Sequence, residues 1–194
     1  MSLFVFGLAL FLGVHSVRIV ADSWRQRTLA RIGAGVWRAG YALIALTGFV
    51  LLVMGWDQVR MAPQILWVAP EGMKHFAGLV TVFAFILLTA AYVPANAIKA
   101  AVGHPMVAGV ILWALVHLLA SGTLAGTILF GSFLVWSVLD FMAARRRDRR
   151  DGVTYARGPA VRTVITVMLG LVSWGLFAFW LHAWLIDIAP LGQP

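Results

Sequence analysis

Six apolar stretches, separated by short polar segments, run along the 194-residue chain. A helix needs about 20 mostly apolar residues to cross the hydrocarbon core of a bilayer. Inside lipid, such a helix satisfies its own backbone polar groups. The pattern therefore predicts an all-α membrane protein in which residues 1–194 form a single domain, one bundle of six transmembrane helices. We expect the spans at about residues 3–19, 40–56, 76–93, 106–120, 124–143 and 161–186.

The connection between the fourth and fifth spans is unusually short. Ser121 and Gly122 leave almost no loop there, so we expect the two spans to form a tight antiparallel hairpin. Gly122 and Gly126 make a pair of small residues four positions apart, which favours close helix approach. We expect this pair to tighten the hairpin rather than to form a dimer face. Pro94 is expected to end the third span.

Composition supports the membrane assignment and excludes several classes of function. Hydrophobic residues make up 62% of the chain and charged residues 11%, whereas soluble domains have about 45–50% and about 25%. The chain has no cysteine, which excludes disulfides, thiolate zinc sites, iron–sulfur clusters and cysteine nucleophiles. We also find no serine-triad pattern, no glycine-rich phosphate loop and no pair of catalytic carboxylates.

Basic residues are distributed unevenly between the predicted loops. Of the 15 Lys and Arg residues, only Arg60 and Lys74 fall in the loops on one side of the membrane. The positive-inside bias then places loops 20–39, 94–105 and 144–160 in the cytoplasm and both termini on the periplasmic side. We interpret the net charge of +8 and the arginine run at 145–150 as topology signals. Binding of the run to anionic lipid or RNA is the less favoured alternative, and we expect membrane lipid but no nucleic acid as a partner.

Five histidines are the remaining chemically versatile residues. His75 and His182 are predicted near the outer interface, and His104 opens the fourth span on the cytoplasmic side. His15 and His117 are predicted to be embedded, which makes them functional candidates by default. The alternative for each is a neutral histidine bonded to a neighbouring helix. Because His104 and His117 are 13 residues apart, about 20 Å along a helix, we expect them to face one pocket only if that helix bends.

Two embedded histidines in different spans fit a haem site. Neutral imidazole binds haem iron, and haem sites in bundles are built from facing helices. Around His117, the residues Gly109, Trp113 and Ala114 recur at helical spacing. Small residues let a flat macrocycle approach the backbone, while ordinary helix packing is an equal alternative.

Basic residues near the cytoplasmic ends of the spans are candidates for the haem propionates. Arg18 follows His15 by one turn, and Arg38 and Lys99 lie at the ends of other spans. The alternative is that all three extend to lipid headgroups.

The residues around these histidines resemble the NnrU family. The resemblance covers about residues 1–145 and is carried by residues 15–19, 92–99, 103–109, 112–120 and 130–133. NnrU-type proteins are bacterial inner-membrane proteins linked by their naming to nitrite and nitric oxide reductase expression. The resemblance therefore implies a multi-pass protein of the bacterial inner membrane with a connection to denitrification.

The NnrU family is in turn similar to the 15-cis-zeta-carotene isomerases, which carry haem b. The shared pattern is a His-Ser pair in the first span and a His-Pro pair followed 13 residues later by another histidine. Carried over, the resemblance implies His15 and His117 as the axial haem ligands and His104 as a catalytic or supporting residue. The isomerases have a cysteine three residues before the second ligand, where this chain has Ala114. Haem binding is therefore better supported than isomerisation.

Three functional hypotheses remain open. The leading one is a haem b-binding membrane protein that acts through redox or ligand chemistry, for example with nitric oxide. The second is a haem-dependent cis–trans isomerase of a carotenoid or similar polyene. The third is a cofactor-free membrane scaffold or assembly factor. The sequence does not decide whether the chain is an enzyme or a homo-oligomer. If helix tilt does not bring His15 and His117 to the same height, His15 and His104 are the alternative pair.

Overall fold

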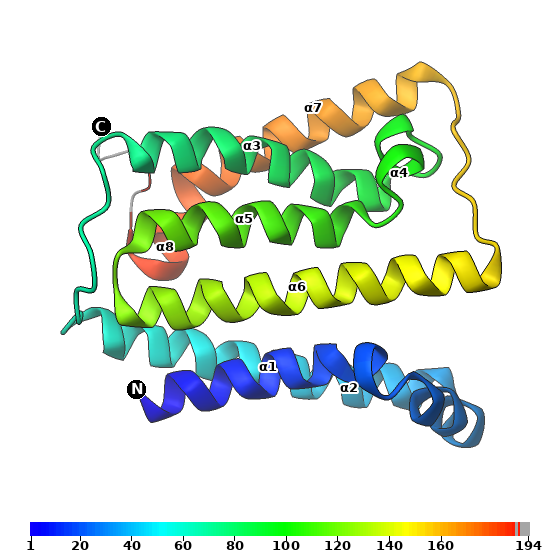
Figure 1. Cartoon of the computed structure of the whole chain (residues 1–194), viewed down its shortest axis with the longest axis horizontal. Helices are drawn as coiled ribbons and strands as arrows, with labels where there is room; N and C mark the ends of the chain where they lie inside the picture. The colour runs from blue at the N-terminus through cyan, green and yellow to red at the C-terminus, as the bar shows by residue number, and fades with distance from the viewer. Residues whose placement is uncertain (189, 191–194) are drawn as a thin grey trace. The chain divides into compact units, whose positions relative to one another are not determined.

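The computed structural model of this chain describes residues 1–188 and 190. Almost all of this part is helical (Figure 1), and it contains no β-strand, only an isolated bridge between Ile65 and Thr123. The predicted all-α class is therefore confirmed. The internal contacts group the helices into two units, residues 1–64 and the part from residue 65 onward. Each unit is described by itself.

The first unit is a helical hairpin whose two helices approach closely. Helix α1 (Ser2–Val20) packs along helix α2 (Asp22–Arg60). A Cβ on Gly48 would lie 2.7 Å from the backbone nitrogen of Phe11, and Gly55 faces the backbone of α1 just as closely. Hydrogen is the only side chain that fits at these positions, so the glycines allow the backbone-to-backbone contact typical of membrane helices.

The connection between these two helices differs from the prediction. We expected a loop at residues 20–39, and that prediction was wrong, because α2 begins at Asp22. The backbone departs from helical geometry at Ala21 (φ −138°, ψ 36°) and again at Gly33 (φ 81°, ψ 159°). Hydropathy identifies the residues that lie in lipid, but Arg, Gln, Leu and Ala are good helix formers outside lipid as well. The polar connection therefore forms a short helix of its own, residues 22–32.

The second unit is a row of packed helices. Helix α3 packs against both α5 and α7, and α5 packs against α6 (Figure 1). Side chains join these helices: the Thr89 hydroxyl donates to the Thr166 carbonyl (3.0 Å), and the Trp174 indole donates to the Gly78 carbonyl (3.1 Å). The elements of this unit are α3 (Met73–Tyr92), α4 (Ala97–Val102), α5 (Pro105–Ser121), α6 (Leu124–Asp151), α7 (Ala160–Leu176), the π-helical η1 (Phe177–Leu181) and α8 (His182–Ile186).

The tight hairpin predicted between the fourth and fifth spans is confirmed. Gly122 ends α5 in the left-handed conformation (φ 63°), which favours glycine. Thr123 then caps the start of α6, and its hydroxyl accepts a hydrogen bond from the Gly126 backbone N–H at 3.1 Å. A side chain at Gly126 would collide with Ser121. The pair of glycines therefore tightens this hairpin, as expected.

The chain has the helices of a multi-pass membrane protein. Among the described residues, five helices are long and apolar enough to cross a bilayer: α1, α2, α3, α6 and the continuous helix Ala160–Ile186. Helix α5 is apolar but has only 17 residues, about 25 Å at 1.5 Å per residue. A six-span count with α5 as the fourth span stays a prediction, as do the periplasmic termini and the single domain.

Two further loop predictions were wrong in their extent. The predicted loop 94–105 contains the short helix α4, and the predicted loop 144–160 begins only after Asp151, where α6 ends. With 28 residues, α6 is about 42 Å long, whereas the hydrocarbon core is about 30 Å thick. The arginine run at 145–150 therefore continues the helix beyond the apolar part instead of forming a flexible loop.

Candidate functional site

His15 lies in the last third of α1, where its ring is held by the preceding turn. Its Nδ1 is 2.6 Å from the Phe11 carbonyl oxygen. A carbonyl only accepts hydrogen bonds, so Nδ1 carries a proton, and in the neutral ring the lone pair is then on Nε2. The Phe11 ring stacks on the imidazole at 4.3 Å between centroids, and Tyr41 contacts it edge-on at 5.3 Å. The ring orientation is therefore set by both a hydrogen bond and aromatic contacts.

His117 has the same local arrangement in α5. Its Nδ1 is 2.8 Å from the Trp113 carbonyl oxygen, one turn earlier. The rings of Trp113 and Phe130 flank the imidazole, with centroid distances of 5.3 and 5.0 Å. The proton again belongs on Nδ1, and Nε2 is the nitrogen that can bind a metal.

The donor chemistry of both histidines fits haem iron. A metal-binding histidine almost always donates its other ring N–H to a carbonyl or carboxylate, which fixes the tautomer and the ring direction. His15 belongs to the first unit and His117 to the second, so their pairing on one iron stays a prediction. Within the described residues no group of three His, Asp or Glu side chains forms a metal site, but haem iron needs only two protein ligands.

The residues predicted around a macrocycle take part in helix packing. Gly109 faces α3, where a Cβ would lie 2.8 Å from the Ala84 carbonyl oxygen. Ala114 is completely buried. Trp113 packs edge-on against Phe130 at 5.2 Å, on α6. Close helix packing thus accounts for these small residues, and their role beside haem stays a prediction.

The two arginines proposed for the propionates both lie in the first unit. The Arg18 Nε is 3.9 Å from the Asp22 carboxylate, and the Arg18 side chain is 58% exposed. Arg38 is exposed as well. Both guanidinium groups are exposed to solvent near the connection between α1 and α2. Their contacts with haem propionates stay a prediction.

His104 lies in a polar cluster that the sequence analysis did not find. It precedes the first residue of α5, and Pro105 occupies the first helical position. Its Nε2 is 2.8 Å from the Asp148 Oδ2, and the Tyr155 hydroxyl donates to the same oxygen at 3.0 Å. One carboxylate oxygen therefore accepts from both side chains, and the Nε2 of His104 is already bound within the protein.

The sequence does contain a signal for this cluster. Phe141 and Asp148 are seven residues apart, so a continuous helix places them on the same face. The Phe141 ring lies 6.3 Å from the His104 ring, edge-on. Extending the helical periodicity of the fifth span past residue 143 would have placed Asp148 on the same face as Phe141, whereas only the packing of α5 against α6 brings that face to His104. Tyr155 follows the helix and has no comparable signal.

Gly103 directly precedes His104 and lies next to the polar cluster. Its φ of 78° lies in the region that favours glycine. A Cβ there would lie 2.9 Å from the Arg145 guanidinium and 3.2 Å from the Tyr155 ring. Gly103 is therefore needed both for the turn before α5 and for the approach of Arg145 and Tyr155.

Helix α5 keeps His104 and His117 apart. It runs without interruption from Pro105 to Ser121, so the two histidines lie near opposite ends of one continuous helix. That they do not face one pocket stays a prediction. His75, near the start of α3, is exposed, and the Nδ1 of His182 is 2.6 Å from the Ile188 carbonyl oxygen.

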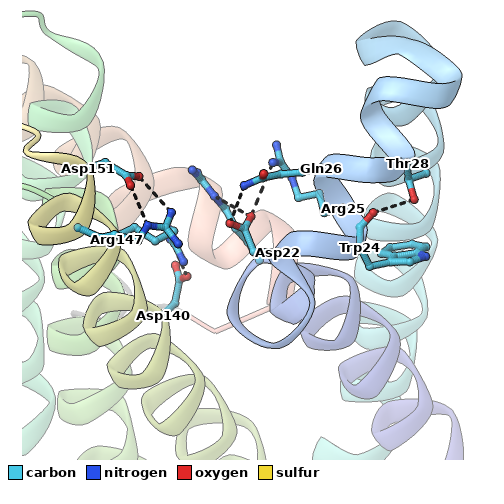
Figure 2. Close-up of polar contacts among 10 residues, drawn as sticks. Asp22, Trp24, Arg25, Gln26, Thr28, Asp140, Arg147 and Asp151 are labelled. Atoms are coloured by element: carbon cyan, nitrogen blue, oxygen red, sulfur yellow. Dashed lines mark hydrogen bonds and ion pairs between the residues drawn. The ribbon is translucent and has the colours of Figure 1, made fainter.

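Asp140 pairs with the arginine run at the end of α6. The Arg147 guanidinium is 4.0 Å from the Asp140 carboxylate (Figure 2). Because the side chains are only 15% and 17% exposed, the pair anchors the basic end of α6 to its own apolar part.

A family model described as "NnrU protein" matches residues 3–190. The chain belongs to the NnrU family. The match extends the resemblance, which we expected over about residues 1–145, to the last helix of this NnrU chain. No curated protein and no solved structure matches it.

Proposed function

We propose that this NnrU-family chain is an integral membrane protein that binds haem b through His15 and His117. One observation carries the proposal. In both histidines Nδ1 lies within hydrogen-bond distance of a carbonyl oxygen four residues earlier, at 2.6 and 2.8 Å. This contact sets the tautomer in which Nε2 is the nitrogen that binds iron. The Nε2 of His104 lies 2.8 Å from the Asp148 carboxylate. The hydrogen bonds therefore favour His117 over His104 as the partner of His15.

The residues around the two histidines would orient them for this role. His15 and His117 would hold the haem b, which when bound would supply a one-electron iron couple and an iron centre able to bind nitric oxide. The carbonyls of Phe11 and Trp113 accept the Nδ1 protons and fix the direction of each ring. Arg18 and Arg38 would pair with the propionates. This chemistry would link the protein to nitric oxide metabolism in denitrification.

His104 would act differently from the two ligands. Its ring proton at Nε2 is directed to Asp148, and Tyr155 donates to the same carboxylate. This arrangement holds a proton next to the start of α5 without exposing Nε2 to a metal. If the protein is an isomerase of a polyene, His104 is the residue that we propose as its catalytic or supporting group.

A cofactor-free scaffold is the second candidate function. Gly109 lies close to α3 and Ala114 is completely buried. Helix packing within the second unit therefore accounts for both small residues without a cofactor, which favours this alternative. In this alternative the Nδ1 hydrogen bonds of His15 and His117 only satisfy polar groups inside the bilayer. The two candidates differ in one measurable property, the presence of haem.

We propose the bacterial inner membrane as the location, with the basic segments on the cytoplasmic side. The five long apolar helices found among the described residues support a membrane location, and the uneven distribution of Lys and Arg supports this orientation. Labelling of single cysteines placed at Arg149 and at Lys74 with a membrane-impermeant reagent tests it. We expect Lys74→Cys to react in intact cells and Arg149→Cys to react only after permeabilisation. The reverse pattern contradicts the orientation.

Reduced-minus-oxidised spectra of the purified full-length protein test the haem proposal. We expect a haem b spectrum for the wild type and its loss in His15→Ala and His117→Ala. His75→Ala is the matched control, since His75 is exposed, and it should keep the full spectrum. A wild-type protein without a Soret band after haem-sufficient expression would leave only the scaffold function.

One more variant identifies the second ligand. His182 shares with His117 an Nδ1 that bonds a carbonyl oxygen. If His182→Ala removes haem and His15→Ala does not, the ligand pair lies within the second unit and the assignment of His15 is wrong.

Chromatography of carotenoids from cells that express the protein tests the isomerase alternative, which requires a change in the cis–trans product ratio.

A further inference from the structure

The short helix between the first two apolar helices has an unusual position. It comprises residues 22–32 and is joined to its neighbours by Ala21 and by Gly33, where the backbone is not helical. Both neighbouring helices, α1 and the remainder of α2, are apolar enough to cross a bilayer. The short helix is therefore tethered at both ends to helices that end at the membrane surface. We name residues 22–32 the connecting helix.

Aromatic contacts hold the connecting helix against the rest of α2, the part that follows Gly33. The Trp24 and Trp37 rings meet edge-on with centroids 5.6 Å apart, and the Arg25 guanidinium lies 6.0 Å from the Trp37 ring centroid. In an unbroken helix, residues 12 or 13 positions apart would be separated by about 18–20 Å. The bend at Gly33 (φ 81°) therefore turns the connecting helix sharply, so that it stays next to the end of α2 instead of extending into solvent.

The connecting helix exposes both positive charge and apolar surface. Arg27 and Arg31 are exposed, and neither has an ion-pair partner in the part of the chain that the structure describes. Trp24 is 50% exposed and Ile32 is 44% exposed. At about 100° per residue, the two arginines lie on one side of Trp24 and Ile32 lies on the other. This order of charged, aromatic and aliphatic residues is typical of a helix that lies in the headgroup region of a membrane.

Local contacts stabilise the connecting helix without neutralising it. Asp22 at its start accepts a hydrogen bond from the Gln26 amide at 3.1 Å and lies 3.9 Å from Arg25 (Figure 2). The Thr28 hydroxyl donates to the Trp24 carbonyl. Asp22 is the single acidic residue of residues 22–32, against three arginines. A net positive charge therefore remains, and it is concentrated at Arg27 and Arg31.

The second basic segment, at the end of α6, is less suited to bind an external anion. Arg147 pairs with Asp140, and Arg150 pairs with Asp151 at 2.8 Å. Arg145 lies against Gly103. Two of the five arginines at 145–150 are therefore opposed by carboxylates of the same helix, and these six residues include no tryptophan. Charge complementarity and exposed apolar surface together favour the connecting helix, rather than the end of α6, as the site that binds an external anion.

We propose that the connecting helix is an interfacial binding site for anionic phospholipid headgroups. Arg27 and Arg31 contact the phosphates, while Trp24 and Ile32 enter the boundary with the acyl chains. The site belongs to the first unit alone and does not depend on haem. Its partner is the lipid surface, because both ends of the helix are joined to helices that are proposed to span the membrane. The exposed apolar side chains are removed from water at such a surface, and the arginines are attracted to its negative charge.

Fluorescence quenching by brominated lipids tests this proposal on the full-length protein. The protein is reconstituted in phosphatidylcholine vesicles that contain brominated phosphatidylglycerol or, in parallel, brominated phosphatidylcholine. The signal of Trp24 is the difference between the wild type and Trp24→Phe. We expect stronger quenching of this signal by the anionic brominated lipid. In Arg27→Gln/Arg31→Gln the preference should fall on the order of tenfold, and high salt should weaken it in the wild type.

The matched control is Arg146→Gln/Arg149→Gln, which removes two arginines from the end of α6 and should keep the preference. Unchanged thermal unfolding of both double variants in detergent confirms that they fold. Equal quenching by the two lipids in the wild type overturns the proposal, as does an unchanged preference in Arg27→Gln/Arg31→Gln. Charge-dependent retention of RNA without any lipid preference would also overturn it, in favour of a nucleic-acid surface.

Discussion

The Nε2 of His104 lies 2.8 Å from the Oδ2 of Asp148, although 44 residues separate them in the chain. The contact joins the start of α5 to the far end of α6, opposite to the end at which Gly122 connects the two helices. The side chains are 23% and 13% exposed. The packing of α5 against α6 is therefore stabilised at both ends of the hairpin, by the tight turn at Gly122 and by the contact between His104 and Asp148.

We expect His104 and Asp148 to be coupled energetically. His104→Gln and Asp148→Asn should each lower the free energy of unfolding by about 1–3 kcal/mol, because each leaves a partly buried polar group without its partner. The double variant should lose less than the sum of the two. Thermal unfolding in detergent measures all three. The matched pair Arg150 and Asp151, whose side chains are 64% and 49% exposed, should show a coupling near zero. Additive effects at His104 and Asp148 would contradict the prediction.

Asn96 should be among the polar residues most sensitive to substitution. Its side chain is fully buried. It donates to the carbonyls of Ala90 and Val93 (2.9 and 2.6 Å) and accepts from the Lys99 backbone N–H (2.8 Å). Asn96→Ala should cost about 2–4 kcal/mol, because several buried groups lose their partner at once.

Two further variants separate the roles of Asn96. Asn96→Asp keeps the acceptor for Lys99 but directs a carboxylate at two carbonyl oxygens, so we expect it to be destabilising too. Thr123→Ala removes a helix cap that the Gly126 N–H uses, and it should cost only about 1 kcal/mol. Melting temperatures of the four proteins in one detergent provide the comparison. An Asn96→Asp protein as stable as the wild type would show that the two carbonyl contacts are unimportant.

Gly48 should tolerate no side chain. A Cβ there would lie 2.7 Å from the backbone nitrogen of Phe11, so Gly48→Ala should push α1 and α2 apart and cost about 1–3 kcal/mol. Gly40→Ala is the control in the same helix, because nothing lies within 4 Å of a Cβ at Gly40. It should be neutral or slightly stabilising. The prediction is wrong if the two variants unfold at the same temperature.

External imidazole should restore haem binding in a variant that lacks the His117 ring. In His117→Gly the side chain is absent but the Trp113 carbonyl remains, so added imidazole can donate a hydrogen bond to this oxygen, as the Nδ1 of His117 does. We expect millimolar imidazole to recover the Soret band that the variant has lost. His75→Gly should keep its spectrum with or without imidazole. A His117→Gly protein with a full haem spectrum before imidazole is added would exclude His117 as a ligand.

The hydropathy pattern by itself determined the helical class and the approximate position of every apolar helix. The physical reason is that lipid requires long apolar segments with satisfied backbones, and this requirement is visible in composition alone. The hairpin at Ser121 and Gly122 could be predicted as well, because a connection of two residues leaves the chain no alternative. Equally, Pro105 and His104 were placed correctly at the start of α5.

Only the tertiary structure decided which polar residues lie together. Arg, Gln and Ala favour helix in water as well as in lipid, so hydropathy did not show that α6 continues to Asp151 or that residues 22–32 form a helix. The partners of His104, which are Asp148 and Tyr155, depend on how α5 and α6 pack and on where the following loop returns. Such contacts join residues distant in sequence, and they arise from packing geometry that no local pattern of residues contains.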